Sequence, residues 1–119
     1  MLQTIKGIVE KNGTPFYVFD EEGFVNNYNN LERTFKSVYP NYQISYSYKT
    51  NYTPFICQLV KRLGGYAEVV SDMEYTLARK LGYDNRCIVY NGPSKGEEMY
   101  EHLENHGILN IDSLDEAKR

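Results

Sequence analysis

Short apolar runs recur along the chain at nearly constant intervals. They begin near Tyr42, Tyr66, Cys87 and Ile108, so the intervals are 24, 21 and 21 residues. Runs of this length that are bounded by turn residues are typical of buried strands, and the segments between them have helical spacing. Strand, helix and strand at this period indicate parallel strands joined by right-handed crossovers, so the predicted fold class is α/β.

Helix start signals occupy matching positions in these repeats. A Ser is followed three residues later by a Glu in Ser71–Glu74, Ser94–Glu97 and Ser113–Glu116. In such a capping box each side chain accepts a hydrogen bond from a backbone N–H that the first helical turn leaves unpaired, so we expect a helix at each. A further helix is predicted to begin after Thr53, with its hydroxyl as cap and Pro54 as the first helical residue, and to end at Gly64-Gly65.

Two apolar patterns lie upstream of the repeats. The spacing of 4, 3 and 4 residues between Phe24, Tyr28, Leu31 and Phe35 predicts a helix over about residues 21–37. A short apolar run, Phe16–Phe19, follows Gly13-Thr14-Pro15.

The last repeat bears on the architecture. It reaches its capping box at Ser113, and the sequence ends at Arg119 without a C-terminal helix signal, so we expect a truncated chain. Four βα units are half of a (β/α)₈ barrel, and a half barrel leaves two strand edges and one sheet face uncovered. An open doubly wound sheet of four or five parallel strands is the alternative, and length does not decide between the two.

Composition excludes several classes of function. The 119 residues are 41% hydrophobic and fit one domain, and 13 Lys and Arg stand against 16 Asp and Glu, for a net charge of -3. No basic cluster is present, which argues against nucleic acid and anionic membranes as partners. The sequence shows no signal peptide and no apolar stretch of about 18 residues, so we expect a cytoplasmic protein without a membrane span.

The cysteines and histidines do not form a recognisable metal motif. Cys57 and Cys87 lie in apolar stretches, so we expect two buried, reduced thiols rather than a disulfide. His102 and His106 are four residues apart but lack the other residues of a zinc-protease helix, and we expect both at the surface.

Candidate chemistry concentrates at the end of the first strand. Bulky side chains alternate there with polar ones: Tyr42, Ile44, Tyr46 and Tyr48 with Gln43, Ser45, Ser47 and Lys49. The bulky set should pack against helices, which leaves the polar set on the other sheet face. Lys49 then stands at the carboxyl end of its strand, where barrel loops converge on a substrate. A partly desolvated amine there is a nucleophile for an aldehyde, whereas the alternative is a lysine paired with an acid or extended into solvent.

An acidic residue interrupts the second strand. Glu68 lies in an otherwise apolar run, where a carboxylate is costly unless it is paired, and Lys49 on the adjacent strand is the expected partner. Ser71, Asn91 and Asp112 end the other strands, so polar groups gather at one edge of the sheet. A site at this edge is the economical explanation, although Ser71 also serves as a cap and Asn91 also fits a turn.

Five separate sequence blocks, spread in a fixed order over nearly the whole chain, form one recognisable pattern. They are Thr14–Asp20, Tyr46–Asn51, Gly64–Ser71 with Glu74, Ile88–Gly92 with Lys95, and Asn110–Ser113 with Glu116. The set resembles the N-terminal part of the pyridoxal-phosphate-dependent decarboxylases of the alanine racemase fold. Diaminopimelate decarboxylases are the nearest group, followed by ornithine and arginine decarboxylases.

The resemblance implies an architecture and a chemistry. Residues 21–119 would form the first half of a (β/α)₈ TIM barrel with about four parallel βα units, and residues 1–20 would carry a strand of the accompanying sheet domain. The implied cofactor is pyridoxal 5'-phosphate, with Lys49 as the catalytic lysine that forms the internal aldimine and Glu68 as a cofactor-binding acid close to it. The implied reaction removes the α-carboxylate of a small amino acid as carbon dioxide. The family usually has Ala or Val, then Ala, around this lysine, and Tyr48 and Thr50 depart from that pattern, which leaves the substrate open.

The resemblance also places important parts downstream. The phosphate-binding loop, the acid that pairs with the pyridine nitrogen and the residues of a homodimer interface would follow Arg119, so we expect this chain alone to be inactive. A self-contained, non-enzymatic α/β binding or scaffold domain, with Lys49 and Glu68 as a structural ion pair, is one alternative. Another enzyme of the same fold and cofactor, such as an amino acid racemase, is a second, and it would need an acid/base residue on the opposite face.

Overall fold

The computed structural model describes residues 2–118 and divides into two compact units, Met1–Thr34 and Phe35–Arg119. Two helices precede the sheet, α1 (Leu2–Asn12) and α2 (Glu21–Val38), and α2 begins in the first unit and ends in the second. The helix predicted over residues 21–37 is therefore confirmed, whereas α1 was not predicted. Among the described helices, none is long and apolar enough to cross a membrane.

Local contacts explain where α2 starts. The Asp20 carboxylate accepts a hydrogen bond from the Gly23 N–H at 2.9 Å and so caps the helix. Phe19, just before this cap, packs on Phe24, with ring centroids 5.5 Å apart. This contact has the geometry of a hydrophobic staple, which fixes the direction from which the chain enters the helix.

The apolar run Phe16–Phe19 forms no strand in the described structure. Residues 13–20 are non-helical, and the side chain of Tyr17 is fully exposed. A strand is defined by pairing, and the described residues of this unit include no second strand that could pair with it. The assignment of residues 1–20 to an accompanying sheet domain stays a prediction.

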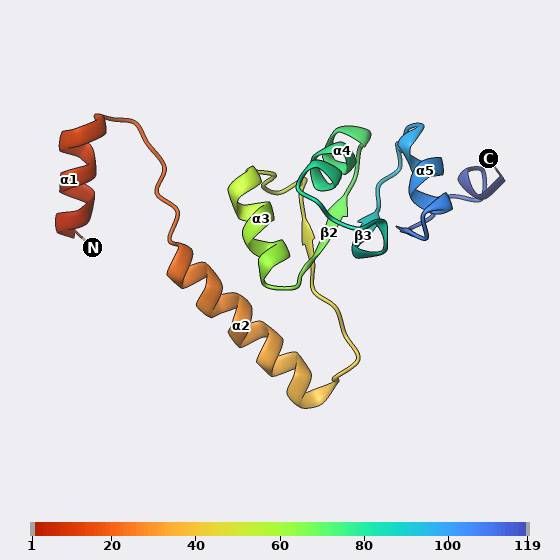
Figure 1. The fold of residues 1–119 in the computed structure, drawn as a ribbon, viewed down its shortest axis with the longest axis horizontal. Coiled ribbons are helices and arrows are strands. Elements are labelled where there is room, and N and C mark those ends of the chain that lie inside the picture. Colours follow the sequence, from red (N-terminus) through yellow and green to blue (C-terminus); the bar gives the residue numbers. More distant parts are fainter. Residues whose placement is uncertain (1, 119) are drawn as a thin grey trace. The chain divides into compact units, whose positions relative to one another are not determined.

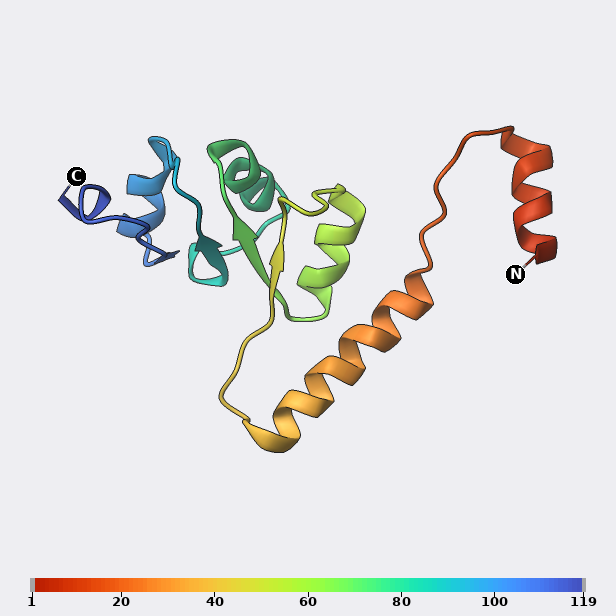
Figure 2. The same cartoon turned by 180° about the vertical axis from the view of Figure 1, so that it is seen from behind.

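The second unit is built on a parallel sheet in the order β1-β2-β3-β4. Its elements are β1 (Ser45–Ser47), α3 (Pro54–Arg62), β2 (Tyr66–Val69), α4 (Asp72–Lys80), β3 (Ile88–Tyr90), α5 (Glu98–Glu104) and β4 (Ile108–Leu109), with 3₁₀ turns η1 (Asn85–Cys87) and η2 (Glu116–Lys118). Figure 1 shows the helices packed alongside the strands, and Figure 2 shows the same elements from behind. The predicted α/β class and the repeating parallel units are confirmed.

One face of this sheet forms the core. Ala67 and Val69 of β2 are buried, while the alternate residues Tyr66 and Glu68 are only partly buried. The buried set belongs to one cluster with side chains of α3, α4 and α5: Tyr48, Cys57, Ala67, Val69, Tyr75, Ala78, Tyr83, Ile88, Tyr90 and Met99. The helices therefore cover one face, and the register pair Ser47 and Glu68 lies on the other, which we call the open face.

The predicted capping boxes form at α4 and at the chain's end. Ser71 Oγ accepts from the Glu74 N–H at 3.3 Å, and Glu74 Oε2 accepts from the Val70 N–H at 2.8 Å. Ser113 and Glu116 repeat this pattern, with Glu116 donating its N–H to Ser113 Oγ at 3.1 Å. The box at Ser71 starts α4 as predicted, whereas the box at Ser113 leads into the 3₁₀ turn η2 and not into an α-helix within residues 2–118.

Two other helix starts differ from prediction. Helix α5 begins at Glu98 with Glu97 as its N-cap and no side-chain capping bond, so the box predicted at Ser94 is wrong. The loop is instead held by Lys95, whose amine hydrogen-bonds the Gly92 carbonyl and two carboxylates. Thr53 does cap α3 by position, but its side chain makes no capping bond, and its N–H donates to Asn51 Oδ1 at 3.0 Å.

The histidines and cysteines correct a further expectation. His102 is fully buried rather than at the surface, with Nε2 3.0 Å from the Ile108 carbonyl and its ring against Tyr75 and Tyr90. Cys57 and Cys87 are free thiols as expected, Cys57 buried and Cys87 partly exposed.

Candidate functional site at the carboxyl edge of the sheet

Lys49 lies in the turn that follows β1. The turn is closed by Thr50, whose N–H and hydroxyl both donate to the Ser47 carbonyl, at 3.3 and 2.7 Å. The Lys49 side chain is exposed, so the expected partial desolvation is not seen in this structure. An exposed amine at the carboxyl end of a parallel strand is accessible to a ligand that approaches this edge.

Tyr48 anchors that turn from the opposite side. Its side chain is fully buried in the core, and its N–H donates to the Glu68 carbonyl at 2.9 Å. Burial, with the Cys57 thiol nearby, raises the pKa of the Tyr48 hydroxyl, which therefore stays neutral. Tyr48 thus fills the core beneath Lys49, so this departure from the family pattern does not add a side chain to the open face.

Glu68 is held by a neighbour other than the predicted one. Its Oε1 accepts a hydrogen bond from Asn91 Nδ2 at 3.1 Å, across β2 and β3. Within residues 2–118 no ion pair joins Glu68 to Lys49, so the expected pairing is corrected. Asn91 is set beside Glu68 because its N–H continues the β3 ladder by donating to the Val69 carbonyl at 2.8 Å.

Ser47 adds a third polar group to the open face. It is in register with Glu68 and lies two residues before Lys49. Its Oγ is buried and has no hydrogen-bond partner among the described residues. Native proteins rarely leave a buried hydroxyl unpaired, so this atom marks a place where a ligand or water would be bound.

A second polar cluster follows β3 and β4. Lys95, with 1% of its side chain exposed, hydrogen-bonds Asp112 Oδ2 at 2.9 Å and Glu116 Oε1 at 2.6 Å. Burial by itself would lower the pKa of Lys95, yet the hydrogen bonds to Glu116 and Asp112 raise it above its usual value. Sequence reasoning placed Asp112 at this edge but did not single out Lys95 as a buried cation, because its partners come from the next repeat.

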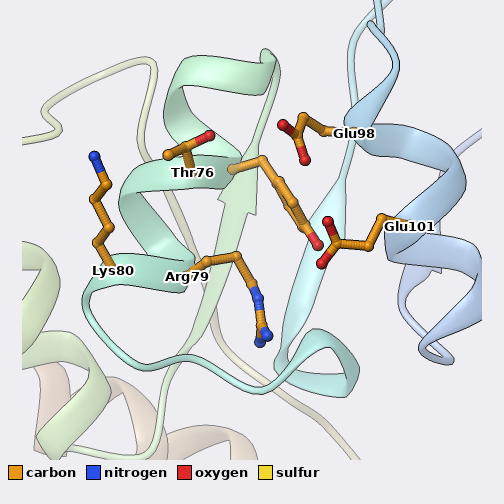
Figure 3. Close-up of a pocket in the computed structure, with 6 residues that line it drawn as sticks. Thr76, Arg79, Lys80, Glu98 and Glu101 are labelled. Atoms are coloured by element: carbon orange, nitrogen blue, oxygen red, sulfur yellow. The ribbon is translucent and has the colours of Figure 1, made fainter.

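Two cavities lie near the sheet, one beside this edge and one away from it. One of about 210 Å³ is lined by Lys95 and Glu116 together with Pro93, Ser94, Met99, Ser113 and Asp115. A wider groove of about 330 Å³ lies between α4 and α5, where Thr76, Arg79 and Lys80 stand on one helix and Glu98 and Glu101 on the other (Figure 3). Lys49 and Glu68 line neither cavity, and Ser71 serves as the cap of α4.

Comparison with known proteins gives the context of this edge. Residues 26–119 match the family described as "Pyridoxal-dependent decarboxylase, pyridoxal binding domain". The diaminopimelate decarboxylase of Methanocaldococcus jannaschii is 36% identical over 115 residues, which cover 92% of this chain and 26% of that protein. The L-glutamyl-[BtrI acyl-carrier protein] decarboxylase of Niallia circulans is 29% identical over 107 residues, 90% of this chain and 24% of the relative.

Solved structures agree on the fold. The diaminopimelate decarboxylase of M. jannaschii in complex with L-lysine has a TM-score of 0.79 at 34% identity and is matched over 92% of this chain and 27% of its own. The lysine decarboxylase of Selenomonas ruminantium reaches 0.79 at 24% identity over 98% of this chain and 31% of its own. This chain spans about a quarter of the length of the curated relatives named above. Its four parallel strands are thus the first half of the barrel of these enzymes.

Proposed function

Because the chain belongs to the pyridoxal-dependent decarboxylases through their pyridoxal binding domain, we propose that it supplies the lysine-bearing part of a carboxy-lyase that acts on an amino acid such as diaminopimelate. The family's cofactor is pyridoxal 5'-phosphate. The observation that carries the proposal is the exposed Lys49 amine at the carboxyl end of β1, inside the matched region and without an ion pair among the described residues.

The residues of the open face suit this cofactor. Lys49 would hold it through the ε-amine, because an unprotonated amine attacks an aldehyde. The Ser47 hydroxyl, buried without a partner, offers a hydrogen bond to a bound group, and Glu68 lies in register beside it. When bound, the cofactor supplies an electron sink for the pair of electrons left by the departing carboxylate.

Each residue of this edge would have a distinct task. Lys49 would hold the cofactor, and its amine would also return a proton to the substrate carbon that loses the carboxylate. Glu68 places a negative charge on the same sheet face, and Tyr48 fixes the strand end from the core side, so that the lysine leaves the sheet in a defined direction. We expect the whole protein to act as a homodimer on a small amino acid, and the Niallia relative shows that carrier-bound amino acids also occur as substrates among such proteins.

Reductive trapping tests the proposal. The chain would be incubated with pyridoxal 5'-phosphate, reduced with borohydride and mapped by mass spectrometry of its peptides. We expect label at Lys49 above every other lysine, and its loss in Lys49→Met but not in Lys80→Met, a matched change at an exposed lysine of α4. Label spread evenly over the exposed lysines would overturn the assignment of Lys49.

A decarboxylase assay tests the companion expectation that this chain alone is inactive. Carbon dioxide release from diaminopimelate would be measured with the cofactor in excess. We expect no release above the uncatalysed rate, because the family's phosphate loop is implied downstream. Robust turnover would contradict this expectation while leaving the assignment of Lys49 intact.

A further inference from the structure

The Glu68 carboxylate has two possible partners, and the structure shows it bound to only one of them. Lys49 follows two residues after Ser47, which is in register with Glu68, and neighbouring strands lie about 4.8 Å apart. Lys49 lies in the turn just after β1, and its long, flexible side chain carries the cationic group nearest in sequence to the register partner of Glu68. Glu68 nevertheless accepts its hydrogen bond from Asn91, on the strand at its other side.

We propose that Asn91 is a positioning residue that holds the Glu68 carboxylate away from Lys49 and so keeps the lysine amine available, an inference that rests on the proposed function. An ion pair would favour the ammonium form of the lysine, and an ammonium group cannot attack an aldehyde. The amide of Asn91 donates to Glu68 Oε1 without carrying a charge of its own. It therefore satisfies the carboxylate while leaving its negative charge on the open face.

The backbone around Asn91 is built to keep this amide in place. Its N–H is tied to the Val69 carbonyl at 2.8 Å, one strand over. The next residue, Gly92, has a φ of +92° and lies so close to Val70 that an added Cβ would meet the Val70 Cβ at 3.0 Å. A side chain at Gly92 would push the loop away from β2, so the glycine lets Asn91 stay beside Glu68.

Competitive labelling tests the inference without any cofactor. Trace acetic anhydride at pH 8 acetylates unprotonated amines, and mass spectrometry gives the labelling of Lys49 relative to Lys80 in the same molecule. We expect Asn91→Ala to slow Lys49 labelling about threefold, the size of effect that an ion pair of an exposed lysine supports. The matched control is Asn110→Ala, because Asn110 follows β4 as Asn91 follows β3, and we expect it to leave the ratio unchanged.

A double-mutant cycle separates positioning from a merely structural role. In a Glu68→Gln background the carboxylate is absent, so Asn91→Ala should have no further effect on Lys49. Asn91→Gln retains an amide donor and should restore much of the labelling. Asn91→Leu keeps the size of the side chain but removes the donor without adding a charge, so it should slow labelling like Asn91→Ala, and it serves as the test if the alanine variant does not fold.

The outcomes divide cleanly. Slower labelling in Asn91→Ala that disappears with Glu68→Gln supports the inference. An unchanged ratio, or an equal loss in both backgrounds, overturns it. Failure of the proposed function would appear elsewhere, as absence of selective cofactor trapping on Lys49 in the wild-type chain, while the labelling result would stand by itself.

Discussion

The two faces of the β-sheet differ in composition: one is apolar and covered by helices, and the other carries polar side chains. On the covered face Tyr48, Val69 and Tyr90 are fully buried against helices. On the open face Ser47 and Glu68 are polar, and Asn91 follows at the strand end. Because apolar burial is the dominant favourable term in folding, the covered face supplies most of the stability, and the open face is free to hold groups chosen for chemistry.

The largest expected loss of stability comes from truncating a buried side chain on the covered face. Tyr90 stacks on Tyr75 with centroids 5.8 Å apart, and its hydroxyl donates to Asp72 Oδ1 at 2.5 Å. Tyr90→Ala removes a buried ring and leaves a cavity, so we expect the free energy of unfolding to fall by about 3–5 kcal/mol. Urea denaturation followed by circular dichroism measures this loss.

The open face provides the control for that change on the same strand. Val89 precedes Tyr90 and is only partly buried. We expect Val89→Ala to cost under about 1.5 kcal/mol. Equal losses from Val89→Ala and Tyr90→Ala would contradict the division between the faces.

The next largest loss of stability is expected at the carboxyl edge of the sheet, in the cluster around Lys95. Lys95→Met keeps the apolar stem but leaves Asp112 and Glu116 facing each other without a cation. We expect a loss of about 2 kcal/mol at pH 7, less than for a fully buried pair because Asp112 is partly exposed.

The pH dependence of this cluster follows from the raised pKa of Lys95. A base whose pKa is raised on folding stabilises the protein below its ordinary pKa, and this contribution is lost as pH rises through the raised value. The difference between wild type and Lys95→Met should therefore persist at pH 9. Lys118→Met, which breaks an exposed pair with Asp115 at 3.7 Å, is the matched control with an expected change near zero.

The covered face was largely predictable from the sequence, because period and caps are local signals. Alternation placed Tyr48 toward the helices, and the spacing of Ser71 and Glu74 marked the start of α4, as the structure shows. The same signal failed at Ser94, where Lys95 binds residues from the following repeat and delays the helix to Glu98. A local pattern cannot reveal a tertiary contact that competes with it.

The open face was predictable in composition but not in pairing. Sequence placed Lys49, Glu68 and Asn91 at one edge but assigned Glu68 to Lys49, because opposite charges on adjacent strands are the simplest partners. In the structure Glu68 accepts a hydrogen bond from Asn91, because the backbone pairing of β2 with β3 places the Asn91 amide beside the Glu68 carboxylate. Which of two neighbouring residues a side chain binds depends on the geometry of the loops after the strands. Residue spacing in the sequence does not predict that geometry.

We expect a smaller loss of stability when acid protonates the buried side chain of His102, which packs against the covered face. The carbonyl of Ile108 only accepts, so His102 Nε2 carries the proton of the neutral ring, and Nδ1 is buried without a partner among residues 2–118. Burial lowers the pKa of His102, and Arg79 adds to the lowering, while the bond to Ile108 opposes it. The unfolded chain therefore binds this proton more readily, and stability is lost as pH falls below about 6.5.

Denaturation at pH 7.5 and 5.5 measures this effect. We expect His102 to account for about 1 kcal/mol of the loss between these values, within the limit of about 1.4 kcal/mol per pH unit for one proton. His102→Gln should flatten the profile relative to His106→Gln, which alters the histidine just beyond α5. Identical profiles for the two variants would show that His102 is not the titrating group.

The smallest effect on stability is expected at Ser47, and its smallness is informative. The hydroxyl is buried without a partner among the described residues, so Ser47→Ala removes an unsatisfied group and should change the free energy of unfolding by under about 0.5 kcal/mol, in the stabilising direction. The same substitution at Ser71, which caps α4, should cost about 1 kcal/mol. A loss of similar size at both serines would mean that the Ser47 hydroxyl does bond within the folded chain. A neutral or stabilising result would mean that folding does not require this hydroxyl, and it would support a role for the open face in binding a group from outside the chain.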